Sequence, residues 1–160
     1  MSGSSDLAPA RFNRSQDHHE LYLKLIRWEL DDEMQKKIDK HQKDRGGNWN
    51  TIEAPLDILP LPKKGIVLID CLTLWLSNNL LEDKDINTEN FINACLDANH
   101  VVCVSNETGL GVVPDNYLAR KFRTAQGQLN QQVAAQSDLV VQVIAGIPLV
   151  LKGELPENIS

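Results

Sequence analysis

The chain has 160 residues, which is the length of one ordinary domain. Hydrophobic residues make up 42% of it and charged residues 24%, a composition typical of a globular protein with a real core. The formal net charge of −6 argues against a nucleic-acid-binding protein, whose binding surface is usually basic, although local basic clusters remain able to meet a nucleotide phosphate.

Membrane and secreted proteins are also disfavoured. No apolar run approaches the ~18 residues that a membrane-spanning helix needs. The N-terminal segment lacks the hydrophobic region of a signal peptide, so we expect a cytoplasmic protein without a membrane span. Cys71, Cys95 and Cys103 show no CxxC spacing, and we expect buried free thiols rather than a zinc site.

In chain order, residues 1–20 are polar and typical of a flexible arm. The apolar residues of 21–30 fit both the alternation of a strand and one face of a helix, so this segment stays ambiguous. Residues 31–45 predict a helix with acidic residues at its start, basic residues at its end and two glycines after it. Residues 54–65 hold three prolines and a glycine and form a connector.

The rest of the chain alternates between strands and helices. Strands are predicted at 66–69, 101–104 and 139–144, with an edge strand or hairpin arm at 148–151, and helices at 73–82, 88–98 and 115–136. The first two strands are uninterrupted apolar runs, so we expect them to be buried on both faces. This order predicts a three-layer α/β domain with a mostly parallel sheet, and no second core or clear domain boundary is evident.

Polar residues follow two of the predicted strands. Asp70 ends the first, and Ser105, Asn106 and Glu107 follow the second. Ligands of open α/β sheets bind beyond the carboxyl ends of the strands, and an apolar strand ending in Asp is one way to hold Mg²⁺ near phosphates. An Asp in this position can equally cap the following helix. The residues alone leave both interpretations open.

The predicted helix 31–45 carries His41 on the same face as Met34 and Ile38. Basic residues surround this histidine in the sequence: Lys36, Lys37, Lys40, Lys43 and Arg45. A histidine that attacks phosphorus needs a neutral ring nitrogen and gains from nearby cations, which stabilise the charge of the transition state. The alternative is a surface helix with a solvated basic face.

Three stretches carry a more specific pattern: DDEMQKKIDKHQKDRGGNWNTIE, IVLIDCLTLWLSNNLL, and VSNETGLGVVPDNYLARKFRTAQGQLNQQVAAQSDLVVQVIAGIPLVLKG. In this order and spacing they resemble the bifunctional adenosylcobinamide kinase/adenosylcobinamide-phosphate guanylyltransferases of cobalamin (vitamin B12) biosynthesis. The resemblance covers about residues 31–153. It implies a P-loop-NTPase-like α/β fold.

The resemblance also implies roles for single residues. His41, followed by Trp49 and Glu53 as the family pattern expects, would be the residue that takes GMP from GTP. Nucleotide contacts are implied for the residues directly after it and for the later glutamate: Gln42, Lys43, Asp44, Arg45 and Glu53. Asp70 stands at the Walker-B-like position, so we expect it to bind nucleotide and Mg²⁺. The loop 106–114 is expected to border the active cleft.

Two reactions are implied. A nucleoside triphosphate, ATP or GTP, phosphorylates the aminopropanol hydroxyl of adenosylcobinamide. GTP then transfers GMP to that phosphate by way of a histidine phosphoramidate, which releases pyrophosphate and gives adenosylcobinamide-GDP. Mg²⁺ would neutralise the polyphosphate in both reactions. The resemblance further implies a homo-oligomer, a trimer, with a site near the subunit boundary.

The N-terminal residues depart from the family pattern. The family begins with a strand and a GxxxxGKS P-loop, whereas the early part of this chain has only Gly3 and no such motif. The family's second strand is not recognisable in LYLKLIRWEL. We therefore separate an atypical, disordered segment 1–30 from an α/β domain 31–160, and expect a sheet that lacks its central strand and has low stability.

Three functions follow from these observations. The first is the bifunctional enzyme or its guanylyltransferase half. The second is a catalytically inactive, P-loop-less paralogue or fragment that acts only by binding or subunit association. The third is an unrelated α/β nucleotide-binding protein.

Overall fold

The computed structural model describes residues 20–24, 49–57 and 60–155. The chain forms two compact units that meet in sequence between Glu107 and Thr108, and each unit is described by itself. The helix predicted at 31–45 lies outside the described residues. The division into an atypical segment 1–30 and an α/β domain 31–160 therefore stays a prediction.

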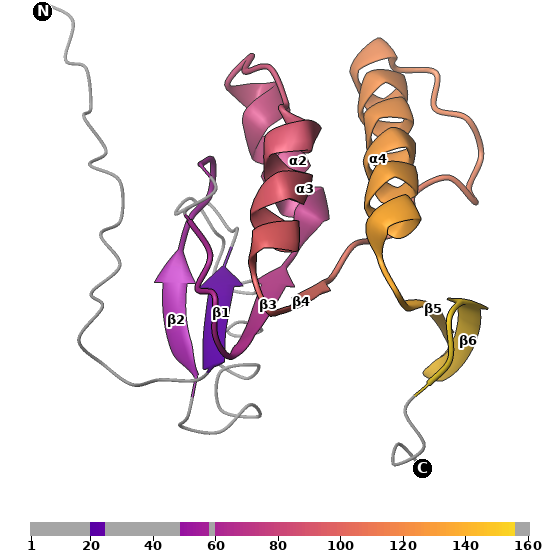
Figure 1. The fold of residues 1–160 in the computed structure, drawn as a ribbon. Coiled ribbons are helices and arrows are strands. Elements are labelled where there is room, and N and C mark those ends of the chain that lie inside the picture. Colours follow the sequence, from indigo (N-terminus) through magenta and orange to yellow (C-terminus); the bar gives the residue numbers. More distant parts are fainter. Residues whose placement is uncertain (1–19, 25–48, 58–59, 156–160) are drawn as a thin grey trace, which may run out of the picture. The chain divides into compact units, whose positions relative to one another are not determined.

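The first unit contains a four-stranded parallel sheet (Figure 1). Its strands are β1 (Glu20–Lys24), β2 (Asn50–Glu53), β3 (Ile66–Asp70) and β4 (His100–Cys103), in the order β2-β1-β3-β4. Two helices, α2 (Leu72–Leu81) and α3 (Thr88–Asp97), connect β3 to β4. The predicted α/β class with parallel strands is confirmed, and the elements predicted between 66 and 104 form within two residues of their expected bounds.

Strand β1 covers residues 21–24 of the ambiguous segment, and the rest of that segment lies outside the described residues. It pairs with β2 along one edge and with β3 along the other, so that Leu21 lies opposite both Asn50 and Val67. The expectation of a sheet without its central strand is therefore wrong for the described strands, because β1 lies between β2 and β3. The alternation of Leu21 and Leu23 was the correct signal, and pairing on both edges gives the strand's backbone groups their hydrogen-bond partners. Among the described strands, pairing runs from β2 to β4 without a gap.

The two faces of the sheet differ in burial. In the register of β3 and β4, Ile69 lies opposite Cys103 on one face and Leu68 lies opposite Val102 on the other. Val67 and Ile69 are fully buried, whereas Val102 is 52% exposed. The prediction that both strands are buried on both faces is therefore wrong. Continuous apolar runs look alike whether one face or two are covered, so the sequence could not distinguish these cases.

The core of this unit lies where α2 and α3 meet. The rings of Trp75 and Phe91 pack with their centroids 5.3 Å apart, a favourable tilted arrangement. The Trp75 indole N–H donates to the Leu56 carbonyl oxygen at 2.9 Å, which fastens the connector to α2. Helix α3 begins at a capped end, because the Asn87 side chain accepts a hydrogen bond from the Asn90 amide at 2.9 Å.

The second unit consists of α4 (Tyr117–Gln136) and a hairpin of β5 (Val140–Ile144) and β6 (Ile147–Lys152). All three elements match the predicted ranges within two residues. The Asn116 side chain caps α4 by accepting from the amides of Leu118 and Ala119 at 2.8 and 3.2 Å. Within the described residues β5 pairs only with β6, in antiparallel fashion, and so forms a separate two-stranded sheet.

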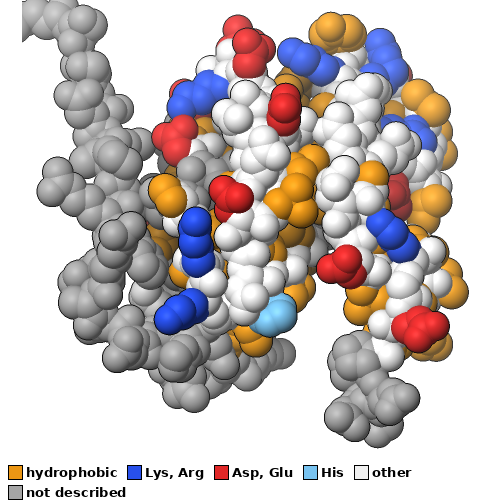
Figure 2. Space-filling model, in the orientation of Figure 1, with side chains coloured by type: hydrophobic (Ala, Val, Ile, Leu, Met, Phe, Trp, Pro, Cys, Tyr) orange, Lys and Arg blue, Asp and Glu red, His pale blue; other side chains and the backbone are white. Residues whose placement is uncertain are grey.

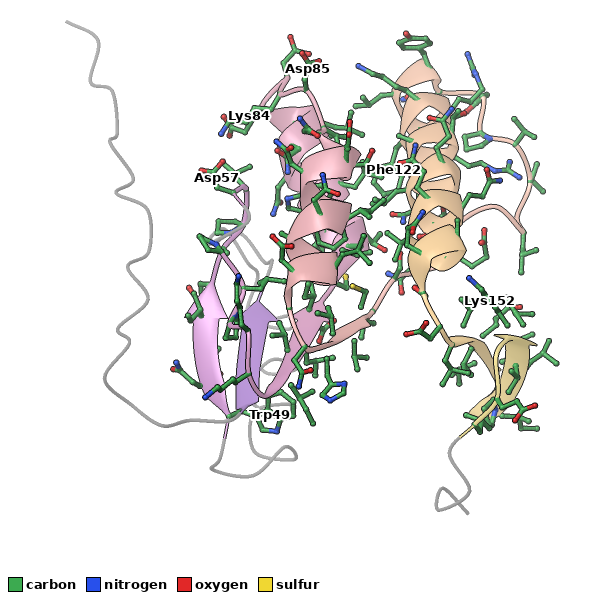
Figure 3. The ribbon with its side chains drawn as sticks, viewed as in Figure 1. Trp49, Asp57, Lys84, Asp85, Phe122 and Lys152 are labelled. Carbon is green, nitrogen blue, oxygen red and sulfur yellow. The ribbon has the colours of Figure 1, made fainter. Side chains whose placement is uncertain are left out.

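Lys152 joins the hairpin to the helix (Figure 3). Its Nζ donates to the carbonyl oxygens of Ala134 and Ala135 at 3.1 and 2.9 Å. These carbonyls belong to the last turn of α4, where partners are missing and a cation is favoured. Gly153 follows with φ +76°, and a Cβ there would lie 2.2 Å from the Asp138 carbonyl oxygen, so only glycine fits.

The outer surface of the hairpin is apolar. Orange atoms mark hydrophobic side chains on this unit in Figure 2. The exposed hydrophobic residues of β5 and β6 are Val143, Ile144, Ile147, Leu149, Val150 and Leu151. These exposed hydrophobic residues occupy both strands of one hairpin, whereas exposed hydrophobic residues on ordinary surfaces are scattered singly.

Replacing Phe91 with Ala should destabilise the first unit strongly. The side chain is 1% exposed, and its loss leaves a cavity beside Trp75, so we expect a cost of about 3–5 kcal/mol. Leu96 on the same helix is 59% exposed, and Leu96→Ala should change stability by no more than about 0.5 kcal/mol. Urea unfolding followed by far-UV circular dichroism measures both, and equal losses would contradict this core assignment.

Candidate functional site

The carboxyl edge of the parallel sheet gathers the polar ends of three strands. Glu53, Lys24 and Asp70 are the last residues of β2, β1 and β3. The register places Lys24 opposite both Glu53 and Asp70, so the three residues form one row across the sheet. Two strand spacings separate the Cα atoms of Glu53 and Asp70 by about 10 Å. Two residues that sequence analysis assigned to a nucleotide site therefore share one edge of the sheet.

Asp70 is the last residue of β3, and α2 begins two residues later at Leu72. The N-cap residue of α2 is Cys71, one residue after Asp70, and the Cys71 side chain makes no capping hydrogen bond. The interpretation of Asp70 as the helix cap is therefore not what the structure shows. Asp70 is half-buried at the position where open α/β sheets bind ligands, which leaves the nucleotide and magnesium interpretation in place.

Three hydrogen bonds hold the segment after β4 against the end of β3 and the start of α2. The Val104 amide donates to the Ile69 carbonyl oxygen, and the Leu72 amide donates to the Val104 carbonyl oxygen, both at 2.9 Å. The Asn106 amide donates to Thr73 Oγ1 at 2.8 Å. The predicted polar ends of the two strands, Asp70 and Asn106, are thereby brought to the same place.

Thr73 is a further residue at this edge, and it was not predicted from the sequence. Its hydroxyl lies in the first turn of α2 and accepts the Asn106 amide, so it positions the loop that follows β4. A hydroxyl residue three positions after a strand-ending acid was a weak signal, because Ser and Thr are also common at helix starts for capping. Only the partner, 33 residues away, reveals its role.

Burial and charge make Cys71 a poor nucleophile. Burial raises the pKa of its thiol above the ordinary value, and the neighbouring Asp70 carboxylate raises it further, against the lowering effect of the Leu74 amide. A thiol with a raised pKa is protonated at neutral pH and does not attack electrophiles well.

The remaining candidate residues lie outside the described part of the chain. These are His41, Gln42, Lys43, Asp44 and Arg45. Their roles stay predictions, and so does the expectation that the loop 106–114 borders a cleft. The described ranges supply Glu53 and Asp70 from the predicted set.

The described residues do not form a metal site made only of protein side chains. Within the described ranges, no group of three or more His, Cys, Asp and Glu side chains could hold a metal ion. Mg²⁺ differs from zinc in this respect, because proteins usually bind it through one or two carboxylates together with substrate phosphates. The position of Asp70 fits that mode of binding.

In the second unit, two arginines of α4 hold the loop that precedes it. Arg120 donates to the Pro114 carbonyl oxygen at 3.1 Å, and Arg123 Nη2 donates to the Gly109 carbonyl oxygen. Arg123 Nη1 and Thr108 Oγ1 are buried without a hydrogen-bond partner in the described part of the chain. A buried guanidinium nitrogen in this state is costly unless an anionic or carbonyl oxygen meets it. Neither Arg123 nor Thr108 was predicted from the sequence as a candidate site residue.

Among the described helices, none combines the length and the apolar character that crossing a bilayer requires.

Thr73→Val should loosen the loop after β4. The change removes the acceptor of the Asn106 amide at nearly constant shape, and a net cost of about 1 kcal/mol corresponds to roughly fivefold faster exchange of that amide. Thr73→Ser keeps the hydroxyl and should exchange like the wild type. Hydrogen–deuterium exchange measures both, and equal rates in the two variants would remove Thr73 from this role.

Comparison with known proteins bears on the chemistry of this edge. The family model described as cobinamide kinase / cobinamide phosphate guanyltransferase matches residues 1–151. The match includes residues 1–30, the segment that departs from the P-loop pattern. Because residues 1–19 lie outside the described part of the chain, an altered P-loop stays a prediction.

Similar proteins come from three bacteria. The bifunctional adenosylcobalamin biosynthesis protein CobP of Pseudomonas aeruginosa is 37% identical over 134 residues, which cover 78% of each chain. The corresponding protein CobU of Escherichia coli is 37% identical over 146 residues, 77% of this chain and 81% of the relative. CobU of Salmonella typhimurium is 35% identical over 146 residues, with the same coverage.

Proposed function

The chain belongs to the cobinamide kinase / cobinamide phosphate guanyltransferase family, and we propose that it phosphorylates adenosylcobinamide and then transfers GMP from GTP to the new phosphate. The product is adenosylcobinamide-GDP. The family match carries this proposal, since it covers residues 1–151. The row of Glu53 and Asp70 at the carboxyl edge supports it, because ligands of parallel sheets bind there.

The transfer step runs through His41. A neutral ring nitrogen attacks the α-phosphorus of GTP, an N–P bond forms, and the bond to the bridging oxygen breaks as pyrophosphate leaves. A phosphate oxygen of adenosylcobinamide phosphate then attacks the same phosphorus, and the N–P bond breaks to free the histidine. The basic residues near His41 in the sequence, Lys40 and Lys43 among them, favour the charge that develops on phosphorus.

The nucleotide contacts fall to two parts of the chain. We assign Gln42, Lys43, Asp44 and Arg45 to one part and Glu53 to the other. Asp70 would hold Mg²⁺ together with phosphate oxygens of the substrate, as its place at the end of β3 allows. Bound Mg²⁺ supplies neutralisation of polyphosphate charge. The kinase donor in this proposal is ATP or GTP.

We extend the proposal to the fold and the assembly. A three-layer P-loop-NTPase-like domain is supported by the second face of the sheet, where Ile66 is 42% exposed and Val102 more so, because a third layer would cover these side chains. We further propose a cytoplasmic homo-oligomer, a trimer, with its site near a subunit boundary.

A second candidate function rests on one observation. The printed sequence contains no GxxxxGKS stretch, and this loop is the usual phosphate cradle of P-loop domains. A catalytically inactive member would act through binding or subunit association alone. Measurement of covalent GMP transfer distinguishes the two functions.

Incubation with Mg²⁺ and GTP labelled at the α-phosphorus should label the protein on His41. The label should be labile in acid and stable in base, as expected for a phosphoramidate. His41→Ala should remove it, because the variant lacks the ring nitrogen that attacks phosphorus. His100→Ala is the matched control, since His100 is exposed at the amino end of β4, away from the carboxyl edge.

An unlabelled wild type would favour the inactive alternative. Equal labelling of wild type and His41→Ala would overturn the role of His41 while leaving guanylyl transfer in place.

Asp70→Asn should slow GMP transfer by about two orders of magnitude, the scale of losing one electrostatic partner of a transition state. The neutral amide keeps the shape but weakens Mg²⁺ binding, so the variant should also need more Mg²⁺ for half-maximal rate. Asp57→Asn is the control, because Asp57 is exposed in the connector (Figure 3). Titration of the transfer rate with Mg²⁺ tests both, and an unchanged Mg²⁺ requirement in Asp70→Asn would contradict the assignment.

A further inference from the structure

One face of the parallel sheet carries apolar side chains that the described residues leave open to solvent. This second face holds Ile66 and Leu68 of β3, and the register places Val102 of β4 opposite Leu68. Ile66 is 42% exposed and Val102 is 52% exposed, whereas Val67 on the first face is fully buried. Covering apolar surface stabilises a fold, so the second face needs a partner.

The order of the strands shows in which direction each connection between them runs. The order is β2-β1-β3-β4. The connections from β2 to β3 and from β3 to β4 therefore move toward the β4 edge, whereas the connection from β1 to β2 moves away from it. Connections between parallel strands of one sheet are almost always right-handed. Right-handed connections that move in opposite directions lie on opposite faces of the sheet.

The two connections that move toward β4 share one side, as this rule requires. The β3–β4 connection contains α2, and the β2–β3 connection contains Pro55 and Leu56. The Trp75 indole N–H of α2 donates to the Leu56 carbonyl oxygen, and Asn78 Nδ2 of α2 donates to the Pro55 carbonyl oxygen at 3.0 Å. Both connections therefore belong to the layer that covers the first, buried face.

The remaining connection consists of residues 25–49, which join β1 to β2. It moves away from β4, so a right-handed path takes it across the second face. It is longer than the dozen or so residues that a parallel crossover needs. Its apolar residues are concentrated in the first half: Leu25, Ile26, Trp28, Leu30, Met34 and Ile38.

We propose that residues 25–49 cross the second face of the sheet, pack over β1 and β2, and cover Ile66 and Leu68 of β3. The predicted helix 31–45 places Met34 and Ile38 on one face, which would meet the sheet. A segment tied at both ends to strands of this sheet has a far higher effective concentration there than a second copy of the chain. The segment is therefore the occupant to which we commit.

This inference identifies the third layer of the proposed domain and does not depend on GMP transfer, so its failure would leave that function in place. It also bears on the row of Glu53, Lys24 and Asp70. The connections after β1 and β3 would leave to opposite faces, and these two strands are neighbours. Ligands of open α/β sheets bind at the carboxyl ends of such a pair. The topology therefore favours the position between Lys24 and Asp70.

Cross-linking of the folded full-length chain tests which face the segment covers. Two variants carry Ile38→Cys, with Ser in place of all three native cysteines. One adds Ile66→Cys on the second face. The matched control adds Leu96→Cys, which is exposed on α3 in the layer over the first face. A short bismaleimide linker is added, and the linked peptides are identified by mass spectrometry.

We expect an intramolecular link from residue 38 to residue 66 that forms about tenfold faster than the link from 38 to 96, because effective concentration falls with distance. A faster link to residue 96 would place the segment over the first face and overturn the proposal. Links that join only separate chains would show a second copy on this face instead. Equal rates for the two pairs would show that the segment has no fixed place on the sheet.

Hydroxyl-radical footprinting of the wild type gives a test without substitutions. Trp28 and Met34 should be oxidised several-fold more slowly in the folded chain than in urea, because the proposal buries them against the sheet. Val112 is 95% exposed and serves as the internal reference in both conditions. If Trp28 and Met34 react as fast in the folded chain as in urea, relative to Val112, the proposal is wrong even where a variant fails to fold.

Discussion

The pairing of β1 on both of its edges is the constraint on which the described sheet depends. Without β1, strands β2 and β3 would have no common neighbour, since each pairs with it along its whole length. Parallel pairing also fixes the register, and a shift by one residue would turn every side chain to the opposite face. The row of Glu53 and Asp70 exists because both strands are in register with the same residue, Lys24.

The same geometry explains how much of the fold could be predicted. Elements between 66 and 152 were found because their apolar residues recur at clear strand or helix periods. Segment 21–30 satisfied both periods, and only its neighbours in space decide between them. The exposed face at Val102 was equally invisible, because periodicity shows where apolar residues lie but not how many layers cover them. Pairing of β5 with β6, rather than with the parallel sheet, depends likewise on tertiary contacts.

The features of the candidate site likewise separate into those that the sequence predicts and those that only the structure reveals. The place of Asp70 at the end of a strand was predictable because an apolar run followed by an acid is a local pattern, whereas its role in binding stays a prediction. The roles of Thr73 and Arg123 were not predictable. Thr73 accepts a hydrogen bond from the amide of Asn106, 33 residues away. Arg123 has a buried nitrogen that finds no hydrogen-bond partner among the described residues. Sequence therefore identifies residues whose role depends on their own element. Residues that hold one element against another appear only in three dimensions.

A site with one carboxylate per strand end is suited to substrates that carry their own charge. Polyphosphate brings several negative oxygens, and Mg²⁺ binds readily to a few protein ligands combined with them. A protein cage of acids would instead repel the triphosphate before the metal arrives. At the described edge the Cα atoms of Glu53 and Asp70 lie about 10 Å apart, with Lys24 between them in the row. Under the function that we propose, this edge would therefore receive Mg²⁺ together with its nucleotide.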